Sequence, residues 1–158
     1  MKAPNLSKAG LILLLMAAIP AGLCAMGMAQ PLRSSEIQWG PAPPVLPAGA
    51  QMAVLAGDPA GSGLVTLRLK MPAGYRIPPH WHPTDEHVTV ISGTFALGMG
   101  DKLSEKQSKT LDAGGYAIAS ANMHHFAWTE TGAVVEVNLM GPFQITYVDP
   151  LDDPSSRK

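Results

Sequence analysis

Short apolar runs, each interrupted after a few residues by glycine, proline, aspartate or asparagine, fill the chain from residue 51 onward. Runs of this kind are typical of β-strands joined by tight turns. In one of them Val65, Leu67 and Leu69 alternate with polar residues, so one face is expected in a core and the other in water. The runs that predict strands of a sandwich or barrel are 52–56, 64–71, 86–92, 94–99, 116–120, 124–129, 133–139 and 143–148.

The composition agrees with a turn-rich β fold. The 158 residues include 16 glycines and 15 prolines, and charged residues are only 15% of the chain. This excess of glycine and proline favours β structure over a helix bundle, and the length suits a single domain. The net charge of -1 gives no bias toward nucleic acid. Only the polar segment 101–109 predicts a helical turn or two.

The first residues have the pattern of an export signal. Lys2 and Lys8 precede the apolar run 11–19, and small residues lead up to Ala29. This run is short for a membrane span but suits the hydrophobic part of a secretory signal. We therefore expect cleavage before Gln30 and a secreted or periplasmic protein without a stable membrane anchor.

The only cysteine, Cys24, falls inside that signal, so the mature chain is expected to have no disulfide. A lipid anchor on Cys24 and a retained membrane anchor are the alternatives. Leu23 argues against the lipid anchor, since a small residue is expected there. The expected organisation is a signal peptide at 1–29, an extended proline-rich arm on the domain surface at 30–50, a β domain at 51–148 and a polar tail at 149–158.

All five histidines lie between positions 80 and 125. On a strand, residues i and i+2 point to the same face, so His80 and His82 would present two imidazoles side by side. Glu86 can return a carboxylate to that face across a turn, and His125 can add a third imidazole from a second strand. Imidazole and carboxylate groups together suit a divalent transition metal.

Glycines around these residues complete a recognisable motif, Gly74-x5-His80-x-His82-x3-Glu86-x6-Gly93. It resembles the first signature of the cupin superfamily at every defined position. The second signature is matched in part, by Gly114-x5-Ser120-x-Asn122-x2-His125-x3-Thr129. The family has proline, glycine and asparagine where this chain has Ser120, Asn122 and Thr129. Because asparagine tolerates a left-handed backbone, Asn122 can still make the turn that aims His125 inward.

The resemblance implies an all-β fold, a conical antiparallel β-barrel of the cupin type, also called a double-stranded β-helix or jelly roll. It also implies one divalent transition metal (Fe, Mn, Ni, Cu or Zn) bound by His80, His82, Glu86 and His125. A barrel of this kind encloses a pocket for a small-molecule substrate or ligand. A homodimer is compatible with it.

Other residues near the motifs are secondary candidates. Neighbours on a strand face opposite ways, so His87 should point out of the barrel when Glu86 points in. A one-residue bulge would reverse this and make His87 an alternative ligand. Arg76 could orient a carboxylate at the pocket mouth, or be a solvated loop residue. The residues considered for the pocket or its rim are Tyr75, Arg76, Met99 and His124.

Three functions remain open at this stage. The first is a metal-dependent enzyme of the oxygenase or isomerase class acting on a small organic molecule, because the cupin family contains such enzymes. The second is a non-catalytic module that binds or senses a metal or small ligand. The third is a structural barrel without metal, since a fold alone does not determine chemistry. No separate catalytic base is evident, so catalytic residues beyond the ligand set are unknown.

Overall fold

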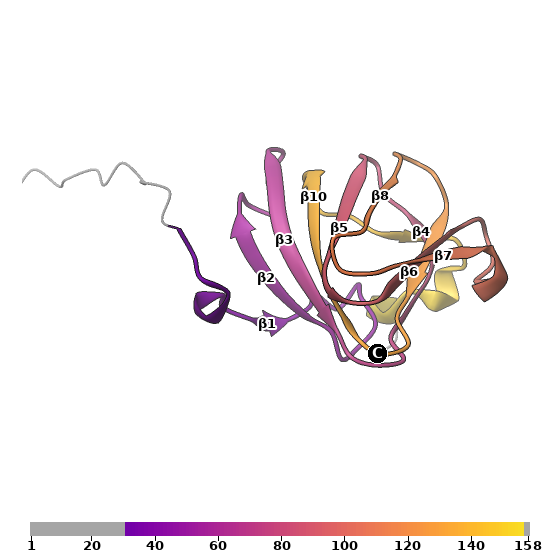
Figure 1. Ribbon diagram of the computed structural model, residues 1–158. Helices are drawn as coiled ribbons and strands as arrows, with labels where there is room; N and C mark the ends of the chain where they lie inside the picture. Colours follow the sequence, from indigo (N-terminus) through magenta and orange to yellow (C-terminus); the bar gives the residue numbers. More distant parts are fainter. Residues whose placement is uncertain (1–30, 157–158) are drawn as a thin grey trace, which may run out of the picture. The chain divides into compact units, whose positions relative to one another are not determined.

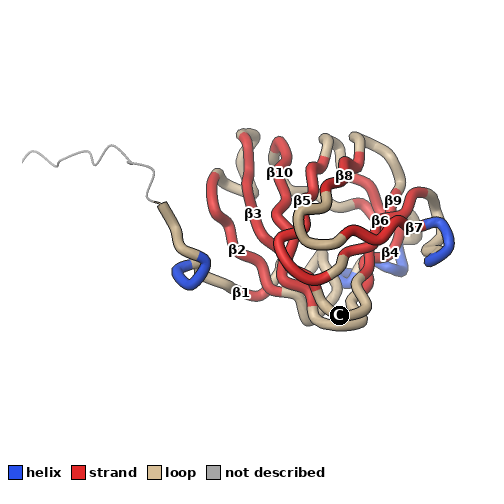
Figure 2. The backbone as a smooth tube through the Cα atoms, in the orientation of Figure 1, coloured by secondary structure: helices blue, strands red, loops and turns tan. Residues whose placement is uncertain are grey.

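The computed structural model describes residues 31–156, so the predicted signal at 1–29 lies outside the described residues. The regular secondary structure of this part of the chain is almost entirely β-strand, joined by loops (Figures 1 and 2). The strands are β1 (Gly40–Pro41), β2 (Gln51–Ala56), β3 (Leu64–Met71), β4 (Arg76–Trp81), β5 (Glu86–Gly93), β6 (Phe95–Met99), β7 (Ser108–Leu111), β8 (Tyr116–Ala119), β9 (His125–Trp128), β10 (Ala133–Met140) and β11 (Thr146–Tyr147). Four single 3-10 turns accompany them: η1 (Ser34–Glu36), η2 (Glu105–Gln107), η3 (Pro150–Asp152) and η4 (Pro154–Ser156).

The strands form two antiparallel sheets. One has the order β1-β2-β3-β10-β5-β8 and the other the order β11-β4-β9-β6-β7. Strands distant in sequence therefore lie side by side. β10 pairs with β3 on one side and with β5 on the other (Figure 1). The all-β prediction is confirmed. The sheets stay separate rather than closing into one continuous barrel, so the arrangement is that of a double-sheet jelly roll.

The hydrophobic core lies between the two sheets. In β10 the residues alternate between buried and half-buried, and Val135 and Val137 point inward. Val137 is paired with Leu67 of β3 on one side and with Val88 of β5 on the other. All of these side chains are buried. The period-two pattern of the sequence therefore places a continuous valine and leucine layer on the inner face of the first sheet.

The proline-rich arm contributes to this core instead of lying only on the surface. Leu46 is 3% exposed and belongs to the core cluster. On either side of it, the hydroxyl of Tyr147 donates to the carbonyl of Val45 and the hydroxyl of Tyr75 donates to the carbonyl of Pro47. Two buried tyrosines thus hold the arm so that Leu46 points inward.

Three strands, β1, β4 and β7, lie outside the runs expected from the sequence. Prolines 78 and 79 lie inside β4, where proline argues against a strand because it cannot donate a ladder hydrogen bond. The segment 101–109 contains one 3-10 turn, η2, and then enters β7. No helix within residues 31–156 is long and apolar enough to cross a membrane.

Candidate metal centre

A bulge in β4 turns His80 toward the interior. Opposite β9, Ile77 pairs with Ala127 and His80 pairs with His125, so two residues of β4 lie opposite one residue of β9. The extra residue lies at the two prolines, which need no ladder hydrogen bond. Because of this bulge, Ile77 and His80 both face the interior despite their odd separation. His82, two residues further on, faces the same way and is buried.

A left-handed turn brings the third histidine to them. Asn122 has a φ of 62°, the only positive φ of a non-glycine residue in the part of the chain that the structure describes. This confirms the expectation that asparagine replaces the family's glycine in that turn. The N–H of Asn122 donates to the carbonyl of His82 at 2.8 Å, and the carboxylate of Asp85 accepts from the N–H of Ala121 at 2.8 Å. These bonds fasten the turn before His125 to the loop after His82.

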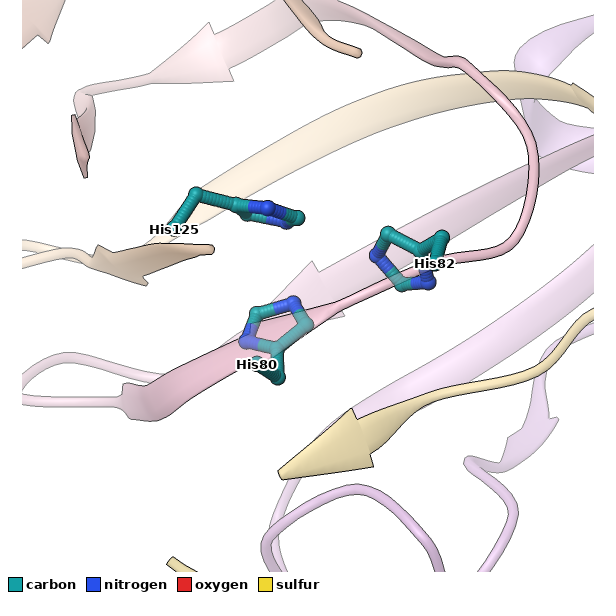
Figure 3. Close-up of side chains that lie close together, drawn as sticks. All are labelled: His80, His82 and His125. Carbon is teal, nitrogen blue, oxygen red and sulfur yellow. The ribbon is translucent and has the colours of Figure 1, made fainter. Parts of the chain in front are cut away.

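The three imidazoles form one buried cluster between the sheets (Figure 3). One ring nitrogen from each of His80, His82 and His125 lies within 4.8 Å of the others. The ring centroids of His80 and His125 are 4.3 Å apart, and each is 5.1 Å from that of His82. Small side-chain rotations would bring the three nitrogens onto a single ion.

Backbone contacts decide which nitrogen of each ring faces the cluster. The Nδ1 atoms of His80, His82 and His125 lie 2.6, 2.6 and 2.9 Å from the carbonyl oxygens of Pro78, Gln144 and Met123. A carbonyl can only accept, so each Nδ1 carries the hydrogen and each neutral ring keeps its lone pair on Nε2. Histidines that bind metals typically have this second hydrogen bond.

Two of these Nε2 atoms are buried and have no hydrogen-bond partner. They belong to His82 and His125. A buried nitrogen without a partner is costly, and a metal ion is a group that would satisfy both. The residues present therefore fit a metal ion.

Glu86, at the start of β5, supplies a carboxylate beside the cluster. Its Oε2 atom lies 3.5 Å from Nε2 of His82 and 3.7 Å from Nε2 of His125. Burial alone would raise its pKa, but the contact with His82 and the charges of the three histidines lower the pKa of Glu86 to about 2. The carboxylate is therefore ionised at neutral pH.

The histidines respond to burial in different ways. Burial, with the nearby His125 and His82, lowers the pKa of His80 to about 3. Burial also lowers the pKa of His125. At His82 burial acts in the same direction, but the contact with Glu86 outweighs it and the pKa is raised. His80 is thus neutral over the physiological range, as a metal ligand must be.

The cluster borders a small internal cavity of about 20 Å³. This volume is enough for about one water molecule. His80, His82, Glu86 and His125 provide its polar lining, and the other lining side chains are apolar and come from both sheets and from the arm.

His87 lies on the opposite face of β5 from Glu86. Its Nδ1 atom is 2.6 Å from the hydroxyl of Tyr116, and it pairs across the sheet with Asn138. No bulge falls between residues 86 and 89 of β5, so strand alternation keeps His87 outside the cluster.

None of the four pocket or rim candidates lines the cavity. Tyr75 is buried, but its hydroxyl holds the arm. Arg76 forms an ion pair with Glu105 at 2.8 Å and lies over the ring of Trp128 on the outside. Met99 is 44% exposed, and the Nδ1 of His124 lies 2.6 Å from Asp101. Alternation along β4 turns Arg76 away from the interior, opposite to Ile77. Met99 shares the face of the lining residues Phe95 and Leu97 but lies at the exposed end of β6.

Comparison with known proteins agrees with this architecture. The family described as a domain of unknown function, DUF4437, matches residues 29–146. The chain belongs to this family. No protein with a curated description matches the sequence.

Solved structures similar to this DUF4437 protein include one described as a cupin. An RmlC-like cupin from Shewanella frigidimarina is 16% identical with a TM-score of 0.55, covering 72% of this chain and 90% of its own. A proposed acetylacetone dioxygenase from Methylibium petroleiphilum is 21% identical with a TM-score of 0.60, covering 79% and 84%. The DMSP lyase DddQ from Ruegeria pomeroyi is 20% identical with a TM-score of 0.58, covering 73% and 63%. At these identities the likeness establishes the fold, so the DUF4437 protein has a cupin-type fold.

Three lining residues of this DUF4437 protein were not singled out in the sequence. Leu46, Phe143 and Ile145 reach the cavity from the arm and from the segment between β10 and β11. The sequence shows each only as an apolar residue near prolines or turns, which predicts burial but not the cavity that it lines.

Proposed function

We propose that this protein is a metal-dependent enzyme that binds one divalent transition metal through His80, His82 and His125, with Glu86 as the fourth ligand. The observation that carries the proposal is the pair of buried Nε2 atoms without hydrogen-bond partners, beside an ionised carboxylate. Iron, manganese, nickel, copper and zinc all suit such ligands.

The chain's own residues prepare the site for this chemistry. A bound metal would supply Lewis acidity toward an oxygen of the substrate or a platform for dioxygen. The carbonyls of Pro78, Gln144 and Met123 orient the imidazoles, and Glu86 offsets part of the positive charge. The apolar lining excludes bulk water from the reacting atoms.

The reaction class that we propose is oxygenation or isomerisation of a small organic molecule. Cupins of similar structure include proteins described as an acetylacetone dioxygenase and a DMSP lyase. Both of these act on small molecules, which supports a small substrate here.

Metal analysis followed by oxygen uptake tests the proposal. Natively purified protein should contain one equivalent of a transition metal and consume oxygen, or isomerise a compound, in a screen of small ketones, enols and phenols. Glu86→Gln keeps the side-chain shape and removes the charge, so it should retain part of the metal and lose turnover. Glu105→Gln, on the exposed surface, is the matched control. Protein that binds no transition metal under any loading condition would refute the proposal.

The second candidate is a non-catalytic binding module, and the size of the cavity favours it. A space of about 20 Å³ leaves little room for a substrate beside a metal unless side chains move. Metal that is bound tightly, without any exogenous ligand reaching it, would support this candidate over the enzyme.

We further propose that the protein acts in the periplasm or outside the cell after removal of residues 1–29. The support is the sequence pattern of Lys2, Lys8, the apolar run and Ala29. Mass spectrometry of protein from the cell envelope should find Gln30 at the N-terminus. A full-length cytosolic species that begins at Met1 would contradict export.

A further inference from the structure

One short stretch of chain both lines the cavity and is partly exposed to solvent. Nearly all side chains that line the cavity are buried, and in the described part of the protein only Phe143 and Ile145 among them are half-buried. A residue that lines the cavity and is also exposed to solvent forms part of the wall between the cavity and the solvent. Residues 143–145, the entrance segment, therefore contain the thinnest part of the cavity wall.

The entrance segment is also the least constrained part of that wall. It lies between β10 and β11, outside any strand, whereas the remaining lining residues except Leu46 and His82 belong to strands. Its backbone is held by the N–H of Phe143, which donates to the carbonyl of Pro59 at 2.8 Å. Opening this segment breaks fewer backbone hydrogen bonds than parting two strands of a sheet.

The entrance segment contacts the metal-ligand cluster directly. The carbonyl of Gln144 accepts the hydrogen bond from Nδ1 of His82 at 2.6 Å. The ring centroid of Phe143 lies 6.3 Å from that of His82, with 32° between the planes. A molecule that passes Phe143 thus arrives beside a proposed ligand.

The lining determines the chemistry of what can enter. Apart from the three histidines and Glu86 it is apolar, and it contains no lysine or arginine. Arg76, the cation nearest in sequence to the cluster, is on the outside with Glu105 and Trp128. A ligand charge away from the metal would be buried without a partner, which is strongly unfavourable.

We propose that the entrance segment is the route by which a ligand reaches the histidine cluster, that Phe143 limits the size of that ligand, and that the ligand is a compact, largely apolar molecule with a single metal-binding oxygen group. This rests on the proposed metal site and adds its access route and its selectivity.

The test uses Co(II) as a spectroscopic metal in the full mature protein, with phenol, azide and 4-hydroxybenzoate as probes. Co(II) binding and ligand addition are both followed by visible absorption in a stopped-flow instrument. Phe143→Ala should raise the association rate constant of phenol at least about tenfold, because wild-type entry requires the ring to move. Azide, which is much smaller, should gain less. 4-Hydroxybenzoate has an oxygen group at each end of its ring, so whichever group binds the metal, the other is buried in the apolar lining without a partner. It should therefore bind at least about tenfold more weakly than phenol in both proteins.

Leu69→Ala is the matched control. Leu69 lines the same cavity but is buried in β3, so the variant enlarges the interior without widening the entrance segment. Its phenol association rate constant should stay within about twofold of wild type. Val135→Ala, also a buried lining residue, replaces it if Leu69→Ala does not fold by circular dichroism.

The outcomes separate this inference from the proposed function. If Co(II) does not bind the wild type, the metal proposal fails. If Co(II) binds but phenol enters Phe143→Ala no faster than wild type, or enters the buried-residue control equally fast, the entrance is elsewhere and the inference is overturned while the metal site stands. If 4-hydroxybenzoate binds as tightly as phenol, the ligand class is overturned.

Discussion

The hydrogen bond from Nδ1 of each imidazole to a backbone carbonyl gives the individual histidines their role. His80, His82 and His125 all carry their proton on the side away from the cluster, so three Nε2 lone pairs converge. His87 has a comparable contact through Nδ1, but to the hydroxyl of Tyr116 on the other face of β5. Histidine thus occurs in two different environments, according to which face of the strand it occupies.

Removal of an imidazole should therefore weaken metal binding only when that imidazole belongs to the buried cluster. His82→Ala deletes one of the partnerless Nε2 atoms and should reduce metal affinity by at least about tenfold, as loss of a ligand or its support commonly does. His87→Ala should leave metal content unchanged. Metal analysis after equilibrium dialysis measures both, and equal losses in the two variants would contradict the assignment.

The burial of His80 predicts how stability depends on pH in the metal-free protein. Its pKa is about 3 in the folded state and about 6.5 in the unfolded chain. Between these values the unfolded chain binds a proton that the folded protein does not, so the free energy of unfolding should fall as pH drops below 6.5. From pH 6.5 to 5 the loss from this group is about 1–2 kcal/mol.

Urea denaturation of chelator-treated protein at pH 7, 6 and 5 measures this dependence. His80→Phe removes this group and should make the profile shallower, while His125, whose pKa is also lowered, acts in the same direction and His82, whose pKa is raised, acts in the opposite direction. Glu86, whose pKa is lowered, would add its own loss only below its unfolded value of 4.5, outside this range. A wild-type protein that becomes more stable from pH 7 to 5 would contradict the prediction.

At the scale of elements, two irregularities position the site. The bulge in β4 keeps Ile77 and His80 on one face, and the left-handed turn at Asn122 leads into β9 with His125 directed inward. The turn is also bonded to the carbonyl of His82. Irregular backbone at these two places therefore brings ligands from β4 and β9 together.

Substitution of Asn122 should test the turn. Asn122→Gly is expected to be tolerated, because glycine adopts a positive φ readily. Asn122→Val places a β-branched residue at a φ of 62° and should cost about 1–2 kcal/mol of stability. It should also weaken metal binding, because the turn holds His125. Met123→Val, in the same turn at an exposed position, should change stability by less than about 0.5 kcal/mol. Thermal denaturation with and without metal measures all three, and equal effects of the two valine substitutions would contradict this account.

For the whole molecule, the core is large enough to fold without a metal. Two sheets bury a shared layer of valine, leucine and aromatic side chains, unlike a zinc finger, whose core is too small. The metal site is therefore expected to add stability to a fold that already exists.

Removal of metal by chelation should leave the β-sheet circular dichroism spectrum intact. A metal present at 100 times its dissociation constant and bound only to the native state adds about 2.7 kcal/mol, which corresponds to a rise in Tm on the order of 10 °C for a domain of this size. Calorimetry of the metal-loaded and metal-free protein measures the shift. Complete unfolding on chelation at room temperature would instead show that the site is structural. That result would favour the non-catalytic binding module over the enzyme.

The local pattern of the chain was sufficient for the fold class and for the ligand candidates. Alternation in runs such as 64–71 depends only on the two-residue period of a strand, and the spacing of His80, His82 and Glu86 depends only on nearby residues. The left-handed turn at Asn122 could be expected because it follows from the conformational tolerance of asparagine.

Contacts between distant segments decided the remaining features of the fold and the site. The bulge places Pro78 and Pro79 in a strand that local preference argues against, the arm inserts Leu46 into the core, and Phe143 meets the cavity beside His82. These features depend on which segments pack together, and no single stretch of sequence contains that information.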